Sequence, residues 1–393
     1  MRRRRLVYLA TVLAGIPAAA AGQRVDTLER TVVVPGVVHR HVRYEGPWDV
    51  HVVEVDLRQP GLVVRAVHAN DQLRGRETVS AISRRKSTDA ATVVAAINAD
   101  FFNLRTGEAE NNQIVDGEIW KAVQVNESPA DSGHHIHTQV AVRDDGRVLF
   151  DKFIFGGTLL RPGGRLLRID GINSRGTRSA NVLYTQRVGA FTPWDSAEAT
   201  IDVRLRRVSQ AGDTVIFQVA SYPFSGGTAR LSDGAVLSLP RSIDSVREVP
   251  GPGEMVRLIA GFRPSSARLR SLVGAWPRLV LHGQSVADSS DRIEATTPAL
   301  SVTRHPRSGV GISRDSATLY LVTVDGRQES SSGVSLVEFA RVMQNLGIYE
   351  GVNLDGGGST TMVVNEKVVN HPSDLTGERT ISNALLVVQT RHD

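Results

Sequence analysis

The chain has 393 residues, 41% of them hydrophobic and 22% charged, so it is not disordered as a whole and can bury a core in one large domain or two smaller ones. It contains no cysteine, which excludes disulfides, a thiol nucleophile and cysteine-bound zinc. Four of its 46 basic residues are Arg2 to Arg5, the other 42 nearly balance 41 acidic residues, and no basic patch indicates a nucleic-acid partner.

Residues 1–21 have the layout of a secretory signal peptide. Arginines precede a short apolar stretch that starts at Leu6, and alanine-rich residues follow, with cleavage expected between Ala19 and Gly22. An uncleaved anchor is the alternative, but the apolar stretch is short for a membrane span, and no later segment is long enough for one. The sequence therefore predicts a secreted or periplasmic protein without membrane attachment after cleavage.

The first half of the mature chain reads mainly as strands. Residues 37–46 and 48–69 alternate apolar and polar side chains, and residues 77–87 favour a short helix capped by Thr78. Residues 91–103 then predict a buried strand that ends in polar side chains at Asn98 and Asp100. A hairpin is expected over 137–157, turning at residues 144–146.

Short strand-like runs continue through about 150–270, and residues 249–255 are rich in proline and glycine. We interpret this region as a β-rich insertion, although its turn-rich end could equally be a loop inside one domain.

The C-terminal third predicts a strand, a helix and a strand in succession. The first strand ends at Asp325, the helix places an apolar stripe over 336–346 and stops at Gly347, and the second strand runs into Asp355. This order favours a βαβ unit with parallel strands and a right-handed crossover. The expected fold class is strand-rich α+β or mixed α/β, with a mixed sheet and a C-terminal βαβ unit that carries the sequence DGGGS.

Parallel strands bring their carboxyl ends to one sheet edge, where ligands bind in α/β proteins. Asp325 and Asp355 end the two strands, and Gly356, Gly357, Gly358 and Ser359 follow the second one. Such a loop suits an anion, phosphate especially, although it is not a Walker loop because no lysine follows the glycines. The alternative is a plain glycine turn with a solvated aspartate.

Two further segments are weaker indications. Arg307, among small residues, could hold a carboxylate or phosphate with two hydrogen bonds, or could be a surface arginine. His134, His135 and His137 are spaced closely enough to suggest a metal, but no matching acid accompanies them, so we predict a polar loop and no metal site.

Several motifs, in a fixed order across about residues 90–390, carry a family resemblance. They are INADFFN, GEAENNQIVDGE, HPRSGVGIS, VDGRQESSSGVSLVEFARVM, VNLDGGGSTTMVVN and HPSDLTGERTISNALLVV. With them the chain resembles the phosphodiester glycosidase family. The resemblance implies a phosphodiester glycosidase domain over 86–393 with the insertion around 150–270. The predicted signal peptide over 1–21 and an N-terminal β-rich segment over 22–85 precede it.

The resemblance also implies an activity. Family members cleave a sugar from a phosphodiester at the anomeric C1–O bond, which here would release a free sugar, N-acetylglucosamine being one candidate, and a phosphate monoester from envelope or extracellular glycopolymers. By match to the family's motifs, the residues implied at the site are Asn98, Asp100, Glu108, Asn112, Arg307, Asp325, Asp355, Gly356, Gly357, Gly358, Ser359, Arg379 and Asn383.

A phosphodiester substrate changes what a glycosidase needs. The leaving group is a phosphate monoester with a second pKa of about 6, so it departs with little protonation but requires stabilisation of its charge. We expect Arg307, helped by Arg379, to hold the phosphate, and Asp355 or Asp325 to act as the carboxylate on the sugar side.

Asn98 and Asn112 would bind sugar hydroxyls or orient the acids. No cofactor is required by the sequence, although a divalent cation could bridge carboxylates and phosphate. Three alternatives stay open: a phosphodiesterase that cuts the P–O bond, a non-catalytic protein that binds envelope glycans, and an envelope protein with a decayed site.

Overall fold

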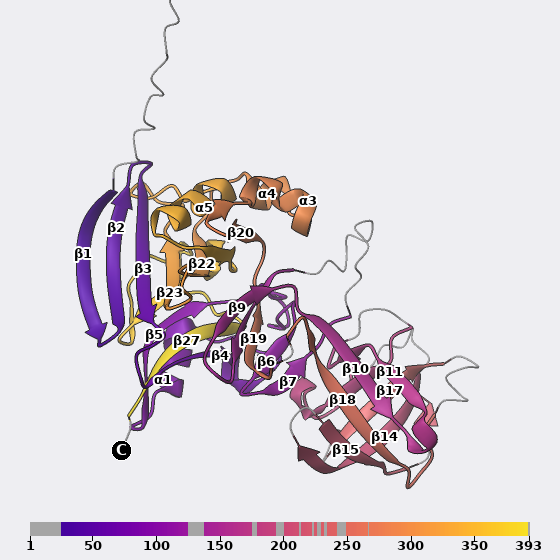
Figure 1. Cartoon of the computed structure of the whole chain (residues 1–393). Helices are drawn as coiled ribbons and strands as arrows, with labels where there is room; N and C mark the ends of the chain where they lie inside the picture. The colour runs from indigo at the N-terminus through magenta and orange to yellow at the C-terminus, as the bar shows by residue number, and fades with distance from the viewer. Residues whose placement is uncertain are drawn as a thin grey trace, which may run out of the picture.

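The computed structural model describes residues 25–124, 137–174, 179–193, 200–211, 214–221, 224–225, 229–231, 234–241, 249–265 and 267–391. The predicted signal peptide at 1–21, and His134 and His135, lie outside these residues. No helix in the described ranges combines the length and apolar character that crossing a membrane requires. The predicted strand-rich architecture is confirmed, because most elements are strands arranged in four sheets (Figure 1).

The largest continuous layer of the main body is an eight-stranded sheet. The alternating segments after residue 36 form strands that bury valines on both faces of this sheet. Val53 and Val55 belong to one buried cluster, and Val50 and Val52, on the opposite face, belong to another. In spatial order the sheet contains β1 (Val25–Val34), β2 (Val37–Tyr44), β3 (Trp48–Asp56), β23 (Thr318–Val324), β22 (Arg307–Ile312), β24 (Glu350–Asn353), β20 (Arg278–Leu281) and β21 (Gln284–Ser285).

The C-terminal βαβ unit is not confirmed in the form predicted. Strands β23 and β24 lie in one sheet and run in the same direction, but they are not neighbours, because β22 pairs antiparallel with both of them. Helix α5 (Leu336–Asn345) connects the two strands, as its periodicity predicts. The unit is therefore split by a strand that precedes it in the chain.

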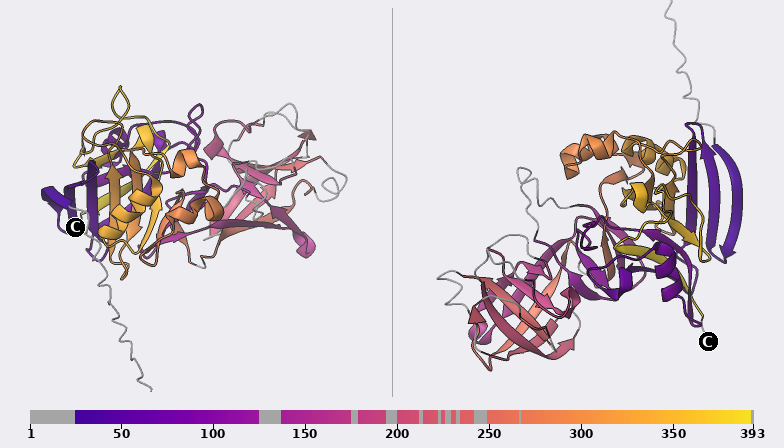
Figure 2. Two further views of the ribbon diagram at one scale, coloured as in Figure 1. Left: turned by 90° about the horizontal axis from the view of Figure 1, so that it is seen from above. Right: turned by 180° about the vertical axis from the view of Figure 1, so that it is seen from behind.

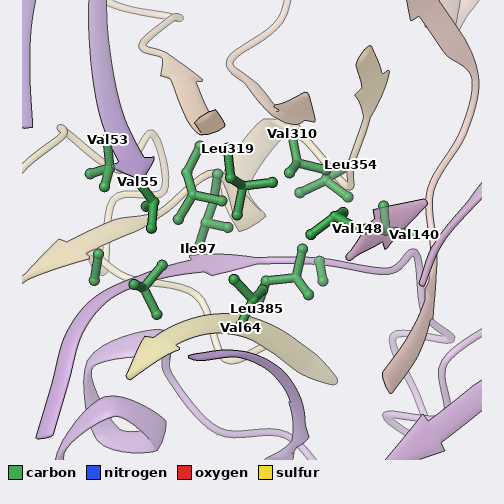
Figure 3. Packing of buried hydrophobic residues seen from close by; sticks show 14 of the residues in the cluster. Val53, Val55, Val64, Ile97, Val140, Val148, Val310, Leu319, Leu354 and Leu385 are labelled. Carbon is green, nitrogen blue, oxygen red and sulfur yellow. The ribbon is translucent and has the colours of Figure 1, made fainter. Parts of the chain in front are cut away.

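A five-stranded sheet packs against the first one, and the main core lies between them (Figure 3). Valines and leucines of β3, β22 and β23 meet Ile97, Leu385 and Val64 of the second sheet. Each such side chain contributes about 1.5–3 kcal/mol when it is fully buried. The order of the second sheet is β26 (Lys367–Val368), β25 (Met362–Val364), β5 (Ala91–Asn98), β27 (Asn383–Thr390) and β4 (Leu62–His68).

A second five-stranded sheet links the main body to the middle of the chain. The predicted hairpin is confirmed, since its strands pair antiparallel on either side of the turn at residues 144–146. The sheet has the order β7 (Glu118–Lys121), β6 (Gln113–Val115), β19 (Leu269–Gly274), β8 (Gln139–Arg143) and β9 (Val148–Asp151).

The middle of the chain forms a nine-stranded sheet that curls into a nearly closed barrel, set to one side of the main body (Figure 2). Its two outermost strands are separated in sequence by Asp170 alone, so both sheet edges come close together. The sheet is mixed, because β12 and β13 are parallel. Its order is β11 (Leu166–Ile169), β10 (Ile154–Leu160), β18 (Met255–Arg263), β15 (Thr214–Val219), β14 (Thr200–Ala211), β17 (Gly234–Pro240), β13 (Val182–Thr185) and β12 (Gly171–Ile172), with β16 (Phe224–Ser225) beside β14.

Helices are few and short in the described ranges. Thr78 caps α1 (Val79–Lys86) as predicted, because its hydroxyl accepts from the Ala81 amide, and Ser335 and Glu338 form a capping box on α5. The other helices are α3 (Ser290–Glu294) and α4 (Pro298–Ser301), with 3₁₀ turns η1 (Ala69–Asp71), η2 (Pro162–Gly164), η3 (Gln186–Val188), η4 (Ala287–Ser289) and η5 (Gly357–Ser359).

Candidate active site

Three predicted residues meet at one edge of the eight-stranded sheet. Asp325 follows the last residue of β23, Asp355 lies two residues beyond β24, and Arg307 opens β22. Because β22 runs opposite to both neighbours, its first residue lies at the edge where they end. Although β22 separates β23 from β24, these three residues therefore lie at the same edge of the sheet.

Each of the three glycines after Asp355 meets a different steric demand. A Cβ on Gly356 would lie 2.8 Å from the Pro306 carbonyl oxygen, and Gly357 has φ +61°, which side chains rarely adopt. A Cβ on Gly358 would lie 2.1 Å from Asp374 and 2.2 Å from Arg379. The loop therefore passes too close to its surroundings for any larger residue.

Most backbone amides of this loop are already bonded within the protein. The amide of Gly356 donates to Asp355 Oδ1 (2.9 Å), that of Gly357 to Pro306 (2.9 Å), and those of Ser359 and Thr360 to carbonyls within the loop. The Gly358 amide has no acceptor in the part of the chain that the structure describes. The loop thus offers an anion fewer amides than its sequence suggests.

Asp355 is held by its main chain, and its carboxylate lies beside the loop. Its amide donates to the Ala99 carbonyl (2.9 Å), and its own carbonyl accepts from Asn98 Nδ2 (2.6 Å). Burial raises the pKa of Asp355 to about 6, against the opposing effects of the Ser359 hydroxyl and the Arg379 guanidinium. The carboxyl is therefore ionised at neutral pH and takes up a proton in mildly acidic solution.

Arg379 lies directly against the glycine loop. Its Nε and Nη2 donate to the two oxygens of Asp374 at 2.7 and 3.0 Å, and this ion pair packs on Gly358. About a third of the Arg379 side chain is exposed (32%). The guanidinium is thus oriented by one carboxylate and keeps donors available for a ligand.

Arg327 is a second cation at the loop, and the motifs do not single it out. Its Nη2 would lie 3.1 Å from a Cβ on Gly357, so the guanidinium covers that glycine. It donates to His305 Nδ1 (3.3 Å) and Ser373 Oγ (3.5 Å) and forms no ion pair among the described residues. Its position two residues after Asp325 is the only sequence signal for it.

Arg307 points into main-chain carbonyls. Its Nε donates to Val334 (3.1 Å), and its Nη2 donates to Leu300 (2.6 Å) and Thr303 (3.1 Å). The side chain is fully buried, and burial lowers its pKa to about 10. Arg307 therefore fixes the segment before β22 and the turn before α5, and its expected direct contact with phosphate stays a prediction.

Asn98 fixes the loop from the neighbouring sheet. Besides donating to Asp355, it accepts through Oδ1 from the Ser308 hydroxyl (2.7 Å) and the Thr361 amide (3.1 Å). Its side chain is buried, so it positions the turn around the carboxylate. Ser308, which completes this set, is not among the residues expected at the site.

Asp100 and Asn383 belong to one buried polar network. Asp100 accepts from the amide and side chain of Asn111 (3.2 and 2.8 Å) and from Gln113 Nε2 (2.6 Å), and its amide donates to Asn383 Oδ1. Gln113 in turn accepts from Asn383 and contacts His68. Burial raises the pKa of Asp100 to about 7.

Glu108 and Asn112 make structural contacts. Glu108 pairs with Arg74 and Lys121, both at 2.8 Å, which holds its pKa below the ordinary value despite burial. Asn112 donates to the Phe153 carbonyl and accepts from the Val123 amide. Their expected contacts with substrate stay predictions.

Glu110 is an exposed carboxylate that the motif comparison did not select. It lies near enough to Asp100 and to Asp355 for its charge to raise the pKa of both. Glu110 is therefore a second carboxylate near Asp355, which residue spacing alone could not reveal.

Asp325 faces a different pocket of about 370 Å³. Its carboxylate accepts from Asn370 Nδ2 (3.0 Å) and from the His371 amide, and burial raises its pKa to about 6. Asn370 also donates to the Thr360 carbonyl, which connects Asp325 to the glycine loop. The other lining residues are Glu29, His39, His41, Asp49, His51, Gln328, Ser330 and Val369. Across the described residues, no cluster of three or more His, Asp or Glu side chains is arranged to hold a metal ion.

An aromatic cluster borders the Asp100 network. His137 stacks on Trp276 with ring centroids 4.8 Å apart, Phe101 meets the same indole edge-on, and His137 also bonds Asn111. Trp276 Nε1 donates to the Glu294 carbonyl (2.7 Å), which fixes the ring. Aromatic faces next to polar side chains suit a ligand with both C–H and hydroxyl surfaces.

Comparison with known proteins confirms the family resemblance. Residues 225–388 match the phosphodiester glycosidase family, a range that contains Arg307, Asp325, Asp355 and Arg379 but not Asn98.

Two curated relatives match over short stretches. An uncharacterized SPbeta prophage-derived protein of Bacillus subtilis is 38% identical over 90 residues, 23% of this chain and 14% of the relative. The N-acetylglucosamine-1-phosphodiester alpha-N-acetylglucosaminidase of Bos taurus is 40% identical over 68 residues, 17% of this chain and 12% of the relative. The matches thus span under a sixth of each relative's length.

Two solved structures share the fold. A hypothetical protein from Synechocystis superposes with a TM-score of 0.72 at 21% identity, covering 95% of this chain and 65% of that one. A candidate exported protein from Burkholderia pseudomallei superposes with a TM-score of 0.65 at 23% identity, covering 88% of this chain and 76% of that one.

Proposed function

From the match of residues 225–388 to the phosphodiester glycosidase family, we propose that this chain hydrolyses a sugar-1-phosphodiester at the anomeric C1–O bond. The products are a free sugar, with N-acetylglucosamine as the first candidate, and a phosphate monoester. The observation that carries the proposal is the glycine loop, which has a carboxylate at its start and two arginines, Arg327 and Arg379, against its glycines.

The phosphate side of the reaction needs stabilisation of negative charge. As the C1–O bond breaks, the bond's electron pair goes to the phosphate oxygen, whose conjugate acid has a pKa of about 6 and so leaves largely unprotonated. Arg379, Arg327 and the free Gly358 amide can each donate to that group. Arg307 contributes indirectly to this phosphate site. Its hydrogen bond to Val334 fixes the segment that contains Pro306, and the Pro306 carbonyl accepts from the Gly357 amide.

The sugar side needs a carboxylate against positive charge at C1. We assign this role to Asp355, since its main chain is fixed from both sides and its pKa of about 6 leaves it ionised at neutral pH. Asp355 either attacks C1 or activates water, and Glu110 supplies the second carboxyl group. The Trp276 and His137 rings offer a surface for the sugar's C–H face.

The setting we propose is outside the cytoplasm, on envelope or extracellular glycopolymers. The leader-like residues 1–21 support this, as does the fold shared with a candidate exported protein. The predicted division of the chain into residues 1–21, 22–85 and 86–393 stays a prediction.

The test is hydrolysis of N-acetylglucosamine-1-phosphodiesters with methyl or nitrophenyl groups, run in ¹⁸O-water. Label in the sugar is expected, and label in the phosphate would establish P–O cleavage instead. Asp355→Asn should lose activity, whereas Asp145→Asn, in an exposed hairpin turn, should not. Binding of envelope glycans without turnover of any sugar-1-phosphodiester would favour a binding protein.

A further inference from the structure

The mouth of the nearly closed barrel holds a polar pocket of about 530 Å³, remote in sequence from the glycine loop. It is large enough for a small ligand, since such sites typically span about 300–1,000 Å³. Strands β7, β13, β14 and β17 and the turn η3 contribute to it. Its lining residues are Glu118, Thr185, Gln186, Arg187, Arg207 and Gly234.

Arg207 projects a charge into this mouth. Val203 and Leu205 of β14 are buried, Arg206 points outward, and Arg207 continues the inward-facing series just before a bulge. Its Nη1 donates to Gln210 Oε1 (3.3 Å), and it has no carboxylate partner in the described chain. The Arg207 side chain is exposed at this end of the barrel, so its charge is accessible to an anionic ligand.

Arg187, in the turn η3, lines the same pocket and is held in place. It pairs with Glu118 through two nitrogens, and its guanidinium carbon lies 4.2 Å from the centroid of the Trp120 ring. The pocket therefore contains two guanidinium groups and one carboxylate, which leaves one positive charge unbalanced.

An apolar recess adjoins the pocket and shares Glu118, Thr185 and Arg207 with it. Its volume is about 80 Å³, well below the roughly 150 Å³ cavity that accepts a benzene ring, so it fits a group of acetyl size and not an alkyl chain. Its apolar lining consists of Ile119, Ile172, Leu183, Val215, Phe217, Leu258 and Ala260.

We propose that the barrel mouth is a binding site for an acidic saccharide that carries a small apolar substituent such as an N-acetyl group. Arg207 binds the acidic group, Gln186 and Glu118 bind hydroxyls, and the recess accepts the acetyl methyl. The site requires no turnover, so it can exist whether or not the glycine loop is catalytic.

The experiment measures binding of N-acetylneuraminic acid to the full chain by saturation-transfer NMR, beside its methyl ester, which lacks the charge, and glucuronic acid, which lacks the acetyl group. We expect saturable binding of the acid, weakened about tenfold by Arg207→Ala, as expected for loss of a charge-assisted hydrogen bond. The ester and glucuronic acid should bind more weakly. Arg206→Ala, next along β14 on the opposite face, should bind like wild type.

Absence of saturable binding, equal affinity for acid and ester, equal affinity for glucuronic acid, or undiminished binding by Arg207→Ala would each overturn the proposal. Hydrolysis of a small sugar-1-phosphodiester by Arg207→Ala should match wild type. That readout separates failure at the barrel mouth from failure of the proposed function.

Discussion

Replacing Gly358 with alanine should remove the proposed hydrolysis while leaving the chain folded. The new Cβ would lie 2.1 Å from Asp374 Oδ1 and 2.2 Å from Arg379 Nη2, whereas ordinary contact starts at 3.4 Å. The ion pair must therefore retreat by about 1.3 Å, and a misplacement of about 1 Å in a catalytic group costs on the order of 100-fold in rate. Gly358 lacks a positive φ, so the change acts through this contact and not through backbone strain.

The stability cost should be small by comparison. Overpacking costs about 1–3 kcal/mol, and loss of a partly exposed ion pair adds at most about 1 kcal/mol. Gly261→Ala is the matched control, because its Cβ would meet nothing within 4 Å and its φ is also not positive. Thermal unfolding of both variants, with kcat/KM on a sugar-1-phosphodiester, separates the two effects.

A double-mutant cycle makes the test specific to Arg379. If Gly358→Ala acts by displacing this guanidinium, it should cost little further activity in an Arg379→Ala background. Additive losses, or a Gly358→Ala protein with kcat/KM near that of wild type, would refute the assignment of Arg379 to the phosphate.

Three other predictions follow from the site. The value of kcat/KM should fall as the pH drops through about 6, because protonation of Asp355 removes the reactive carboxylate; a profile flat from pH 5 to 8 would contradict its role. Arg327→Ala should raise KM for the phosphodiester about tenfold, the worth of one charge-assisted hydrogen bond, whereas Arg304→Ala, whose exposed side chain pairs with Glu338, should leave KM unchanged. Asp100→Asn should gain thermal stability relative to wild type as the pH rises from about 4 to 7, because the raised pKa of Asp100 means that wild type loses stability as this carboxyl ionises; a difference in Tm that does not vary with pH would show that Asp100 is not perturbed.

Local elements were predictable because their signals are local. The apolar stripe of α5, the Thr78 cap of α1 and the turn of the β8–β9 hairpin each depend on residues within one element. Strand order does not: β22 lies between β23 and β24 because of contacts that only the folded chain makes. The same limit applies to the barrel, whose strands were recognisable but whose closure depends on Leu166–Ile169 and Gly171–Ile172 occupying opposite sheet edges.

The candidate site likewise has features that the sequence predicts and features that only the folded chain shows. The glycine loop was predictable because three glycines after an aspartate indicate that other groups lie very close to the backbone. In the structure these groups are Pro306 at Gly356, Arg327 at Gly357, and the Asp374–Arg379 pair at Gly358. The residue type of Arg307 could not show that its guanidinium donates to main-chain carbonyls, because the surrounding fold sets the direction in which the side chain points.

Two further features of the site also depend on the folded chain. Glu110 and Trp276 gain their significance only from neighbours that are distant in sequence.

The barrel and the sheet that carries Gln113 share one buried cluster, although the chain enters and leaves the barrel at neighbouring positions. Ile154 of β10 pairs with Arg263 of β18, so entry and exit lie side by side. Yet Ile114 and Leu272, from the sheet that carries Gln113, belong to the same buried cluster as Leu159 and Phe217. Excising the barrel would expose the remaining side chains of that cluster next to Gln113, which bonds Asp100, so a chain engineered without the barrel should also lose the buried polar network.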